Sequence, residues 1–174
     1  MSRISALTPE RMNPEQRKVY EESVARGLPT GGPYTAYIRI PQFMALNREM
    51  SNYLRSNSLP GRLRQMIVLR TIKNWGAKFP WVVQVRNSLK EGLEQSIIDA
   101  IDKGQEPALT SPKDVAAFQL CKELVQTHQV SDKTYEQALE LFGENGVADI
   151  VVTTGFFTMV SFTANAFNID PPTD

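Results

Sequence analysis

Only Cys121 and His128 carry side chains suited to thiol or imidazole chemistry. A single cysteine excludes an intramolecular disulfide, and one cysteine with one histidine gives too few soft ligands for a zinc site built by the protein alone. Cys121 lies on the apolar face of a helical pattern, where a thiol is most often buried and inert. His128 lies where a helix is expected to end, which suits a surface cation. We therefore expect no metal site and no bound cofactor.

Residues 74–87, NWGAKFPWVVQVRN, resemble an active-site segment in their aromatic and apolar pattern but contain no Cys, His, Asp or Glu. Gln84 and Asn87 are three residues apart, so they share a helical face and can form a polar stripe or be solvated. Trp81 can stack on a planar substrate or belong to the core. Lys78 can bind a carboxylate, polarise a carbonyl or lie exposed. The segment therefore favours neutral hydrogen bonding over acid–base catalysis.

Start and stop signals predict four helices in the first half of the chain. Asn13 can cap the first, with Pro14 in its first turn and Gly27 at its end. Pro80 suits the first turn of the fourth, because its missing N–H would be unpaired there in any case. Gly76 separates the third and fourth helices, which form a short helical hairpin. The four helices span residues 13–27, 41–57, 60–75 and 80–92.

Four more helices are predicted in the second half. Ser111 and Ser131 are N-cap candidates, and Gly143 can end the seventh helix. The last segment is rich in Val, Thr and Phe, but it is too long for one strand and has no hairpin signal. These helices span residues 93–104, 111–128, 131–143 and 145–167. We therefore predict an all-α, single-domain bundle of about eight helices over residues 1–174, with a central helical hairpin.

The composition is that of an ordinary soluble globular protein. The chain has 19 basic and 19 acidic residues, so its zero net charge gives no electrostatic case for nucleic acid or an anionic membrane. No apolar run approaches the roughly 18–20 residues of a membrane span, and the N-terminus lacks a signal-peptide core. We therefore expect a cytoplasmic protein. Because the last helix is apolar on more than one face, we also expect a homo-oligomer.

Four sequence blocks, in this order, resemble the carboxymuconolactone decarboxylase-like proteins, the superfamily that includes alkylhydroperoxidase D. The blocks are GGPYTAYIRIPQF, LPGRLRQMIVLRTIKNWGAKFPW, VSDKTYEQALELFGENGVADIV and GFFTMVSFTANAFNIDPP. The resemblance covers almost the whole chain. It implies an all-helical fold with the active site on a helical hairpin, and assembly into dimers, trimers or hexamers with pockets near the subunit contacts.

The resemblance also implies which reactive groups are missing. Redox members carry a Glu, two cysteines and a His on the hairpin, and many thiol-free relatives carry a Glu and His set. Aligned on LRQMIVLR, the redox positions hold Gln65, Ala77, Pro80 and Gln84. A thiol peroxidase needs a low-pKa cysteine and a second thiol to resolve its sulfenic acid, and Cys121 has no such partner. Glutamine cannot transfer a proton near neutral pH, although it can hydrogen-bond a carbonyl or hydroxyl.

Eight residues make up the predicted site. Tyr34 and Tyr37 follow the GGP turn, which in relatives lies near the hairpin, so each phenol can donate a hydrogen bond or simply pack. Arg64 and Arg70 flank Gln65, and a buried arginine there needs an anion, for which we prefer a structural carboxylate such as Asp149 over a substrate. The predicted catalytic residues are Gln65, Gln84, Lys78 and Tyr34, and the predicted substrate-binding residues are Trp81, Tyr37, Asn87 and Arg70.

Three functions compete at this stage. The first is a cofactor-independent lyase, isomerase or cyclase of a biosynthetic or catabolic pathway, acting on a small hydrophobic metabolite by orientation and neutral hydrogen bonding. The second is an oligomeric binding protein that has lost its chemistry. The third, a peroxiredoxin-like alkylhydroperoxidase, is disfavoured because the paired cysteines are missing.

Overall fold

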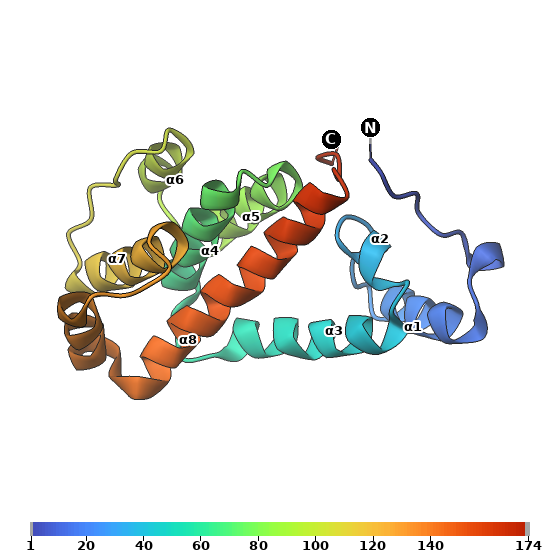
Figure 1. Cartoon of the computed structure of the whole chain (residues 1–174), viewed down its shortest axis with the longest axis horizontal. Helices are drawn as coiled ribbons and strands as arrows, with labels where there is room; N and C mark the ends of the chain where they lie inside the picture. Colours follow the sequence, from blue (N-terminus) through green and yellow to red (C-terminus); the bar gives the residue numbers. More distant parts are fainter. Residues whose placement is uncertain (1, 173–174) are drawn as a thin grey trace.

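The computed structural model describes residues 2–172, and every regular element in that range is helical (Figure 1). The all-α prediction is confirmed, and a 3₁₀ turn at Pro9–Arg11 precedes eight α-helices. The helices are α1 (Pro14–Ala25), α2 (Tyr34–Tyr37), α3 (Pro41–Ser56), α4 (Gly61–Trp75), α5 (Lys78–Lys90), α6 (Gln95–Asp102), α7 (Pro112–Gln126) and α8 (Asp132–Ala166).

Side-chain caps start several helices where the sequence predicts them. Asn13 and Gln16 form a complete capping box, with Gln16 N donating to Asn13 Oδ1 at 2.9 Å and Asn13 N donating to Gln16 Oε1 at 3.1 Å. Ser111 and Ser131 each accept a hydrogen bond from the backbone N–H three residues on, at the starts of α7 and α8. Gly76 ends α4 in the left-handed conformation, with φ 60°.

Two features differ from the predicted helix pattern. The GGP segment contains the short helix α2, because four residues are too few to produce a periodic signal. α5 begins at Lys78 rather than at Pro80. As predicted, the helical conformation is interrupted at Gly143, whose φ of 66° and ψ of 176° kink the chain between two helical parts of α8.

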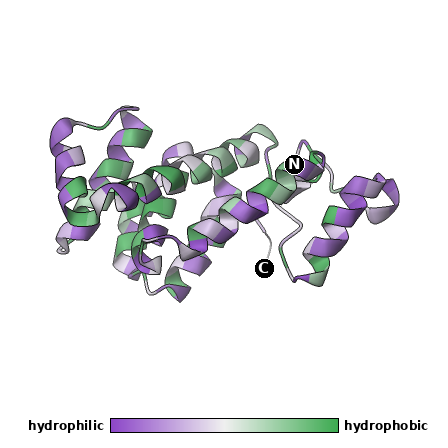
Figure 2. Cartoon of the chain, turned by 90° about the horizontal axis from the view of Figure 1, so that it is seen from below, coloured by the Kyte–Doolittle hydropathy of each residue, from purple (hydrophilic) through white to green (hydrophobic). Residues whose placement is uncertain are grey.

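α4 lies at the centre of the bundle. It packs against α5, α6, α7 and α8, and nine of its fifteen residues are buried, including Met66, Ile67 and Leu69. In Figure 2 the apolar colour is concentrated in the helices of this bundle, whereas the N-terminal helix at the right is more hydrophilic. Burial of α4 on several sides accounts for its long apolar run, since such a helix cannot face water.

α8 is helical throughout its Val- and Thr-rich part, as predicted. Thr154 Oγ1 donates to Ile150 O at 2.8 Å, and Ser161 Oγ donates to Phe157 O at 2.7 Å. The helix thus satisfies its own buried hydroxyls. Within the described part of the chain it is the one helix long and apolar enough to span a membrane, which differs from the expectation that no run approaches that length. Bundle core helices pass the same test, and 44% of its most apolar window is buried.

The N-terminal helices form a second, smaller apolar cluster around Tyr37 and Met44, away from α4–α7 along α3 (Figure 1). The other end of α3 is held against α8 by Asp149. This carboxylate accepts hydrogen bonds from Tyr53 Oη at 2.5 Å, from Ser58 N at 2.9 Å and from Ser58 Oγ at 2.6 Å. Asp149 therefore fixes where α3 leaves the bundle.

The prediction that Asp149 pairs with an arginine of α4 is wrong, because its oxygens are occupied by α3 and the following loop. Arg64 instead lies 3.8 Å from Glu91 Oε1 and donates to Leu59 O at 3.2 Å. A structural partner for Arg64 thus exists, but it comes from the end of α5.

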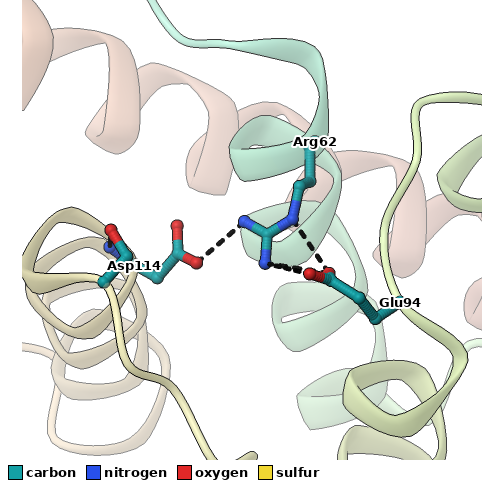
Figure 3. Close-up of polar contacts among 4 residues, drawn as sticks. Arg62, Glu94 and Asp114 are labelled. Atoms are coloured by element: carbon teal, nitrogen blue, oxygen red, sulfur yellow. Dashed lines mark hydrogen bonds and ion pairs between the residues drawn. The ribbon is translucent and has the colours of Figure 1, made fainter.

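Arg62 joins the starts of three elements, as Figure 3 shows. Its Nη1 donates to Asp114 Oδ2 in the first turn of α7 at 2.8 Å. Its Nε and Nη2 donate to the two oxygens of Glu94, the residue before α6, at 2.9 and 3.0 Å. The two parallel hydrogen bonds between Arg62 and Glu94 restrict the relative orientation of the two side chains as well as their distance. Together with the bond to Asp114, they hold the starts of α6 and α7 against the first turn of α4.

Candidate functional site

A cavity of about 550 Å³ lies between α3, α5 and α8, with the α2 region and Gln65 of α4 completing its wall. This volume is in the usual range for small-molecule sites. The lining residues are Pro29, Gly31, Gly32, Pro33, Tyr34, Tyr37, Asn47, Ser51, Leu54, Arg55, Gln65, Phe79, Pro80, Val83, Gln84, Asn87, Phe156, Phe157, Val160 and Pro172. Five of the eight predicted site residues are among them, namely Gln65, Gln84, Asn87, Tyr34 and Tyr37.

The hairpin contributes three amides to this cavity. Ser88 Oγ lies 3.2 Å from Gln65 Oε1 and 2.7 Å from the main-chain oxygen of Gln84, so it holds α4 and α5 together behind the wall. Asn87 Nδ2 donates to Gln84 Oε1 at 3.2 Å. Within residues 2–172, the Nε2 atoms of Gln65 and Gln84 donate to no protein atom. The amides of Gln65 and Gln84 are thus each held at the oxygen and have a free donor at the nitrogen.

Gln65 and Gln84 are not bonded to each other directly, although both lie on the cavity wall as predicted from the hairpin. Ser88 lies between the Gln65 side chain and the main-chain oxygen of Gln84, and it is not among the predicted site residues. Its small hydroxyl side chain, fully buried in α5, allows α4 to approach closely.

Tyr37 is fixed within the wall. Thr163 Oγ1 donates to Met159 O at 3.0 Å, so its one hydrogen is used and Tyr37 Oη is the donor in their 3.0 Å contact. Burial raises the pKa of Tyr37, although the bond to Thr163 opposes the shift. Tyr37 therefore stays neutral at physiological pH, and its proton is directed away from a ligand.

Tyr34 packs edge-on against Tyr37, with 5.9 Å between the ring centroids. The guanidinium carbon of Arg48 lies 3.9 Å from the centre of the Tyr34 ring, a cation–π arrangement. Arg48 Nη2 donates to Pro29 O. The Tyr34 ring therefore has the buried Arg48 guanidinium on one face and also contributes to the cavity wall.

α3 supplies one wall through Asn47, Ser51, Leu54 and Arg55, which share a helical face because they are three, four or eight residues apart. Asn47 is only 1% exposed, and its Nδ2 has no hydrogen-bond partner. Arg55 donates to Ser51 Oγ at 3.1 Å. These polar residues lie next to a row of exposed apolar residues on α3, and from the sequence this pattern predicts only a helix. The stripe was therefore visible in the sequence but was not recognised as a wall.

The opposite wall is apolar and comes from α5 and α8, through Pro80, Val83, Phe156, Phe157 and Val160. Phe156 and Phe157 pack edge-on, with 5.3 Å between the ring centroids. Among the described residues that line the cavity there is no Asp, Glu, His, Lys or Cys, and Arg55 is the one charged residue. The site can therefore orient and hydrogen-bond a ligand, but its side chains offer no ready proton carrier near neutral pH.

Three predicted residues lie outside this cavity. Lys78 and Trp81 line a separate depression on the far side of the hairpin turn, together with Lys73 and Asp102. There Lys73 Nζ lies 5.4 Å from the Trp81 ring centre, and Trp81 packs against the bundle core. Arg70 lies beside Phe118 and Glu106, where burial lowers its pKa. The helical period accounts for this, since α4 and α5 present only one face each to the cavity.

Cys121 is fully buried in α7, as predicted, and Thr71 Oγ1 lies 3.4 Å from its Sγ. Burial raises the pKa of this thiol, which is the opposite of what peroxide reduction needs. His128 lies exposed beyond the end of α7 in a left-handed conformation, with φ 63°. Across residues 2–172, no group of three His, Cys, Asp or Glu side chains is placed to hold a metal ion.

No family model matches the sequence, and no curated protein matches it. Solved structures match the fold. An alkylhydroperoxidase AhpD core, an uncharacterized peroxidase-related protein from Ralstonia eutropha JMP134, has a TM-score of 0.79 at 17% identity, over 98% of this chain and 92% of that one. A protein of unknown function from Agrobacterium tumefaciens, related by name to the antioxidant defence protein AhpD, has a TM-score of 0.70 at 20% identity, over 77% and 93%. The chain therefore has the alkylhydroperoxidase D-like fold that the four sequence blocks imply.

Proposed function

We propose that this alkylhydroperoxidase D-like fold serves as a cofactor-independent enzyme of the lyase, isomerase or cyclase type, which acts on a small hydrophobic metabolite in the cavity. The observation that carries the proposal is the composition of the cavity lining. Aromatic and aliphatic side chains surround the amides of Gln65 and Gln84, each of which retains a free N–H donor. An apolar site with a few convergent polar groups is the usual form of a small-molecule site.

Catalysis in such a site rests on orientation. The free amide ends of Gln65 and Gln84 can bind a carbonyl or hydroxyl oxygen while the apolar wall fixes the rest of the substrate. Ring closure, rearrangement, and dehydration or decarboxylation of an activated carbonyl compound suit this arrangement, because the substrate supplies its own reactivity. Reactions that need a protein base near neutral pH do not suit it.

A second candidate is a binding protein without turnover. It is favoured by one observation, namely that the described lining residues include no carboxylate, imidazole, amine or thiol. Binding by shape and neutral hydrogen bonds requires none of these groups.

Thiol peroxidase activity has little support despite the names of the two matching structures. Likeness at 17% and 20% identity concerns the fold. The one cysteine lies buried in α7, and no cysteine lines the cavity among the residues described. Similarity to these structures therefore supports the fold of this chain and not the peroxidase activity that their names suggest.

We also propose a homo-oligomer in the cytoplasm. Leu46, Met50 and Tyr53 lie on one face of α3 and are 63%, 41% and 52% exposed. A row of this kind on a helix is typical of a surface that a partner covers. The fold is that of a soluble protein, and the composition agrees with a cytoplasmic one.

The test combines turnover with binding. The protein is incubated with a panel of hydrophobic carbonyl compounds, products are followed by mass spectrometry, and bound molecules by native mass spectrometry. Gln65→Met keeps the length of the side chain and removes its amide, so we expect turnover to fall by roughly 100- to 1,000-fold, as for loss of one preorganised donor. Gln95→Met changes an exposed glutamine of α6 and should leave the rate unchanged. Binding without turnover across the panel supports the second candidate. If the protein shows no binding and no turnover with any compound of the panel, both candidates are refuted.

A further inference from the structure

The α3 wall contains positive charge that the protein does not neutralise. Arg55 lines the cavity and bonds only to the neutral side chains of Ser51 and Asn52, at 3.1 and 3.3 Å. Arg48 lies behind Tyr34, is 6% exposed, and has no partner for its Nε and Nη1 atoms. Neither arginine forms an ion pair within residues 2–172.

The surroundings of Arg48 add to this excess. Burial lowers its pKa, interactions with Tyr34 oppose that shift, and the neighbouring guanidinium groups of Arg55 and Arg26 lower the pKa further. Arg48 does not line the cavity, so the charge that a ligand there meets directly is that of Arg55. Since the described cavity wall has no acidic residue, Arg55 has no anionic partner from that wall.

Asn47 provides an independent indication at the same wall. Its Nδ2 is buried without a partner in a residue that lines the cavity. An unpaired buried donor is destabilising, and a ligand oxygen at this position would remove that cost by accepting a hydrogen bond. Asn47 precedes Arg55 by about two turns, so both lie on the same side of α3, roughly 12 Å apart along its axis, and the Arg55 side chain extends back toward Ser51, which lies between them.

We propose that the cavity binds a hydrophobic monocarboxylate, with its carboxylate at the α3 wall near Asn47 and Arg55 and its apolar body against Phe156, Phe157 and Val83. This inference rests on the proposed use of the cavity as a small-molecule site and specifies its ligand. One lining cation and a mostly apolar wall match a single negative charge. A phosphate, with two charges and three acceptor oxygens, would need more donors than this wall provides.

The experiment compares two probes of the same ring system, 2-naphthoate and its neutral amide, by titration calorimetry with the full chain. We expect the carboxylate to bind at least about tenfold more tightly than the amide, which is the usual scale of one charge-assisted hydrogen bond. Arg55→Gln should remove most of this preference. Arg11→Gln, which changes an exposed arginine outside the cavity, should retain it.

A second variant separates a ligand contact from a structural role. Asn47→Leu removes the unpaired donor in favour of an apolar side chain of similar size, so we expect a higher melting temperature without ligand and weaker binding of 2-naphthoate. Equal affinities for the two probes, or equal losses in Arg55→Gln and Arg11→Gln, would overturn the carboxylate assignment and leave the cavity as a binding site. If neither probe binds, both the assignment and the proposed use of the cavity fail.

Discussion

At the scale of single residues, the hairpin shows how replacement changes a site without removing it. The positions aligned with a catalytic Glu and His hold Gln65 and Gln84, and both remain on a cavity wall. Ala77 and Pro80, at the aligned cysteine positions, are both buried near the start of α5. The sequence could predict that thiol chemistry is absent here, because it requires particular atoms. It could not predict the free ends of the amides, which depend on Ser88 for Gln65 and on Asn87 for Gln84.

The thiol of Cys121 should be unreactive in the folded protein. Because burial raises its pKa, we expect a thiol reagent such as dithiobis(nitrobenzoate) to react slowly with the native chain and rapidly after unfolding in guanidinium. Cys121→Ser should leave peroxide turnover with a reducing partner at the background of the wild type. Thiol-dependent turnover that the variant loses would contradict this assignment.

Gly32 should tolerate no side chain. Its φ is +63°, and a Cβ there would lie 2.3 Å from the Phe79 ring, so Phe79 has to move. Together with the cost of the left-handed backbone, we expect Gly32→Ala to lower the free energy of unfolding by about 1–3 kcal/mol and to weaken ligand binding. The control is Gly31→Ala, since a Cβ at Gly31 meets nothing within 4 Å. Chemical denaturation of both variants provides the measurement, and equal stability would disprove the close contact.

At the scale of elements, the helix starts and ends predicted from caps, prolines and glycines lie within about two residues of the observed ones. Caps such as Asn13, Ser111 and Ser131 are local chemistry, which a sequence displays directly. Gly143 is a local stop signal of the same kind, and its φ of 66° and ψ of 176° interrupt the helical conformation of α8 there. Arg70, predicted in the site because it flanks Gln65, lies outside the cavity, since closeness in sequence does not show which face of a helix a residue occupies.

Glu123 connects α7 to the start of α8, and its contribution should depend on pH. Ser131 N, Gln119 Nε2 and Thr134 Oγ1 donate to it at 2.8, 3.0 and 2.7 Å, and these bonds lower its pKa from 4.5 to about 2. A lowered folded-state pKa means that the stabilisation is full above pH 4.5 and is lost as the pH falls from 4.5 to about 2.

We therefore expect Glu123→Gln to destabilise the protein by about 1 kcal/mol at pH 7, a modest figure because the carboxylate is partly solvated. The difference from wild type should shrink as the pH is lowered below 4.5. Denaturation at a series of pH values measures it, with Glu136→Gln on the exposed side of α8 as the control. A difference that does not change with pH would contradict the role of the charge.

At the scale of the whole molecule, the cavity lies between two separately packed parts. Phe156 and Phe157 belong to the bundle, whereas Tyr37 belongs to the cluster built by Met12 and Met44. The sequence could indicate both sets of apolar residues. Their arrangement around a cavity could not be predicted, because α3 is held on α8 by Asp149, a contact between residues about 90 positions apart. Prediction of one domain over residues 1–174 stays a prediction.

Assembly should depend on the exposed row of α3. Leu46→Glu places a charge in the middle of that row, where Leu46 is 63% exposed, so we expect the fold to persist and the oligomer to dissociate. Light scattering coupled to size-exclusion chromatography measures the mass. Val24→Glu, on α1 at 54% exposure, is the matched control and should leave the mass unchanged. Dissociation by both variants, or by neither, would remove α3 as the interface.

The positions of the two tryptophans determine what an optical experiment can report. Trp75 donates from Nε1 to Thr158 Oγ1 at 3.0 Å and packs on Phe162, while Trp81 packs against the bundle core. Neither indole lines the cavity, and neither belongs to the N-terminal cluster. Intrinsic tryptophan emission is therefore a reporter of the bundle alone. An unchanged tryptophan emission spectrum on adding a ligand is therefore compatible with binding in the cavity. Unfolding of α1–α3 before the bundle would not change this emission, so it has to be followed by tyrosine fluorescence or circular dichroism.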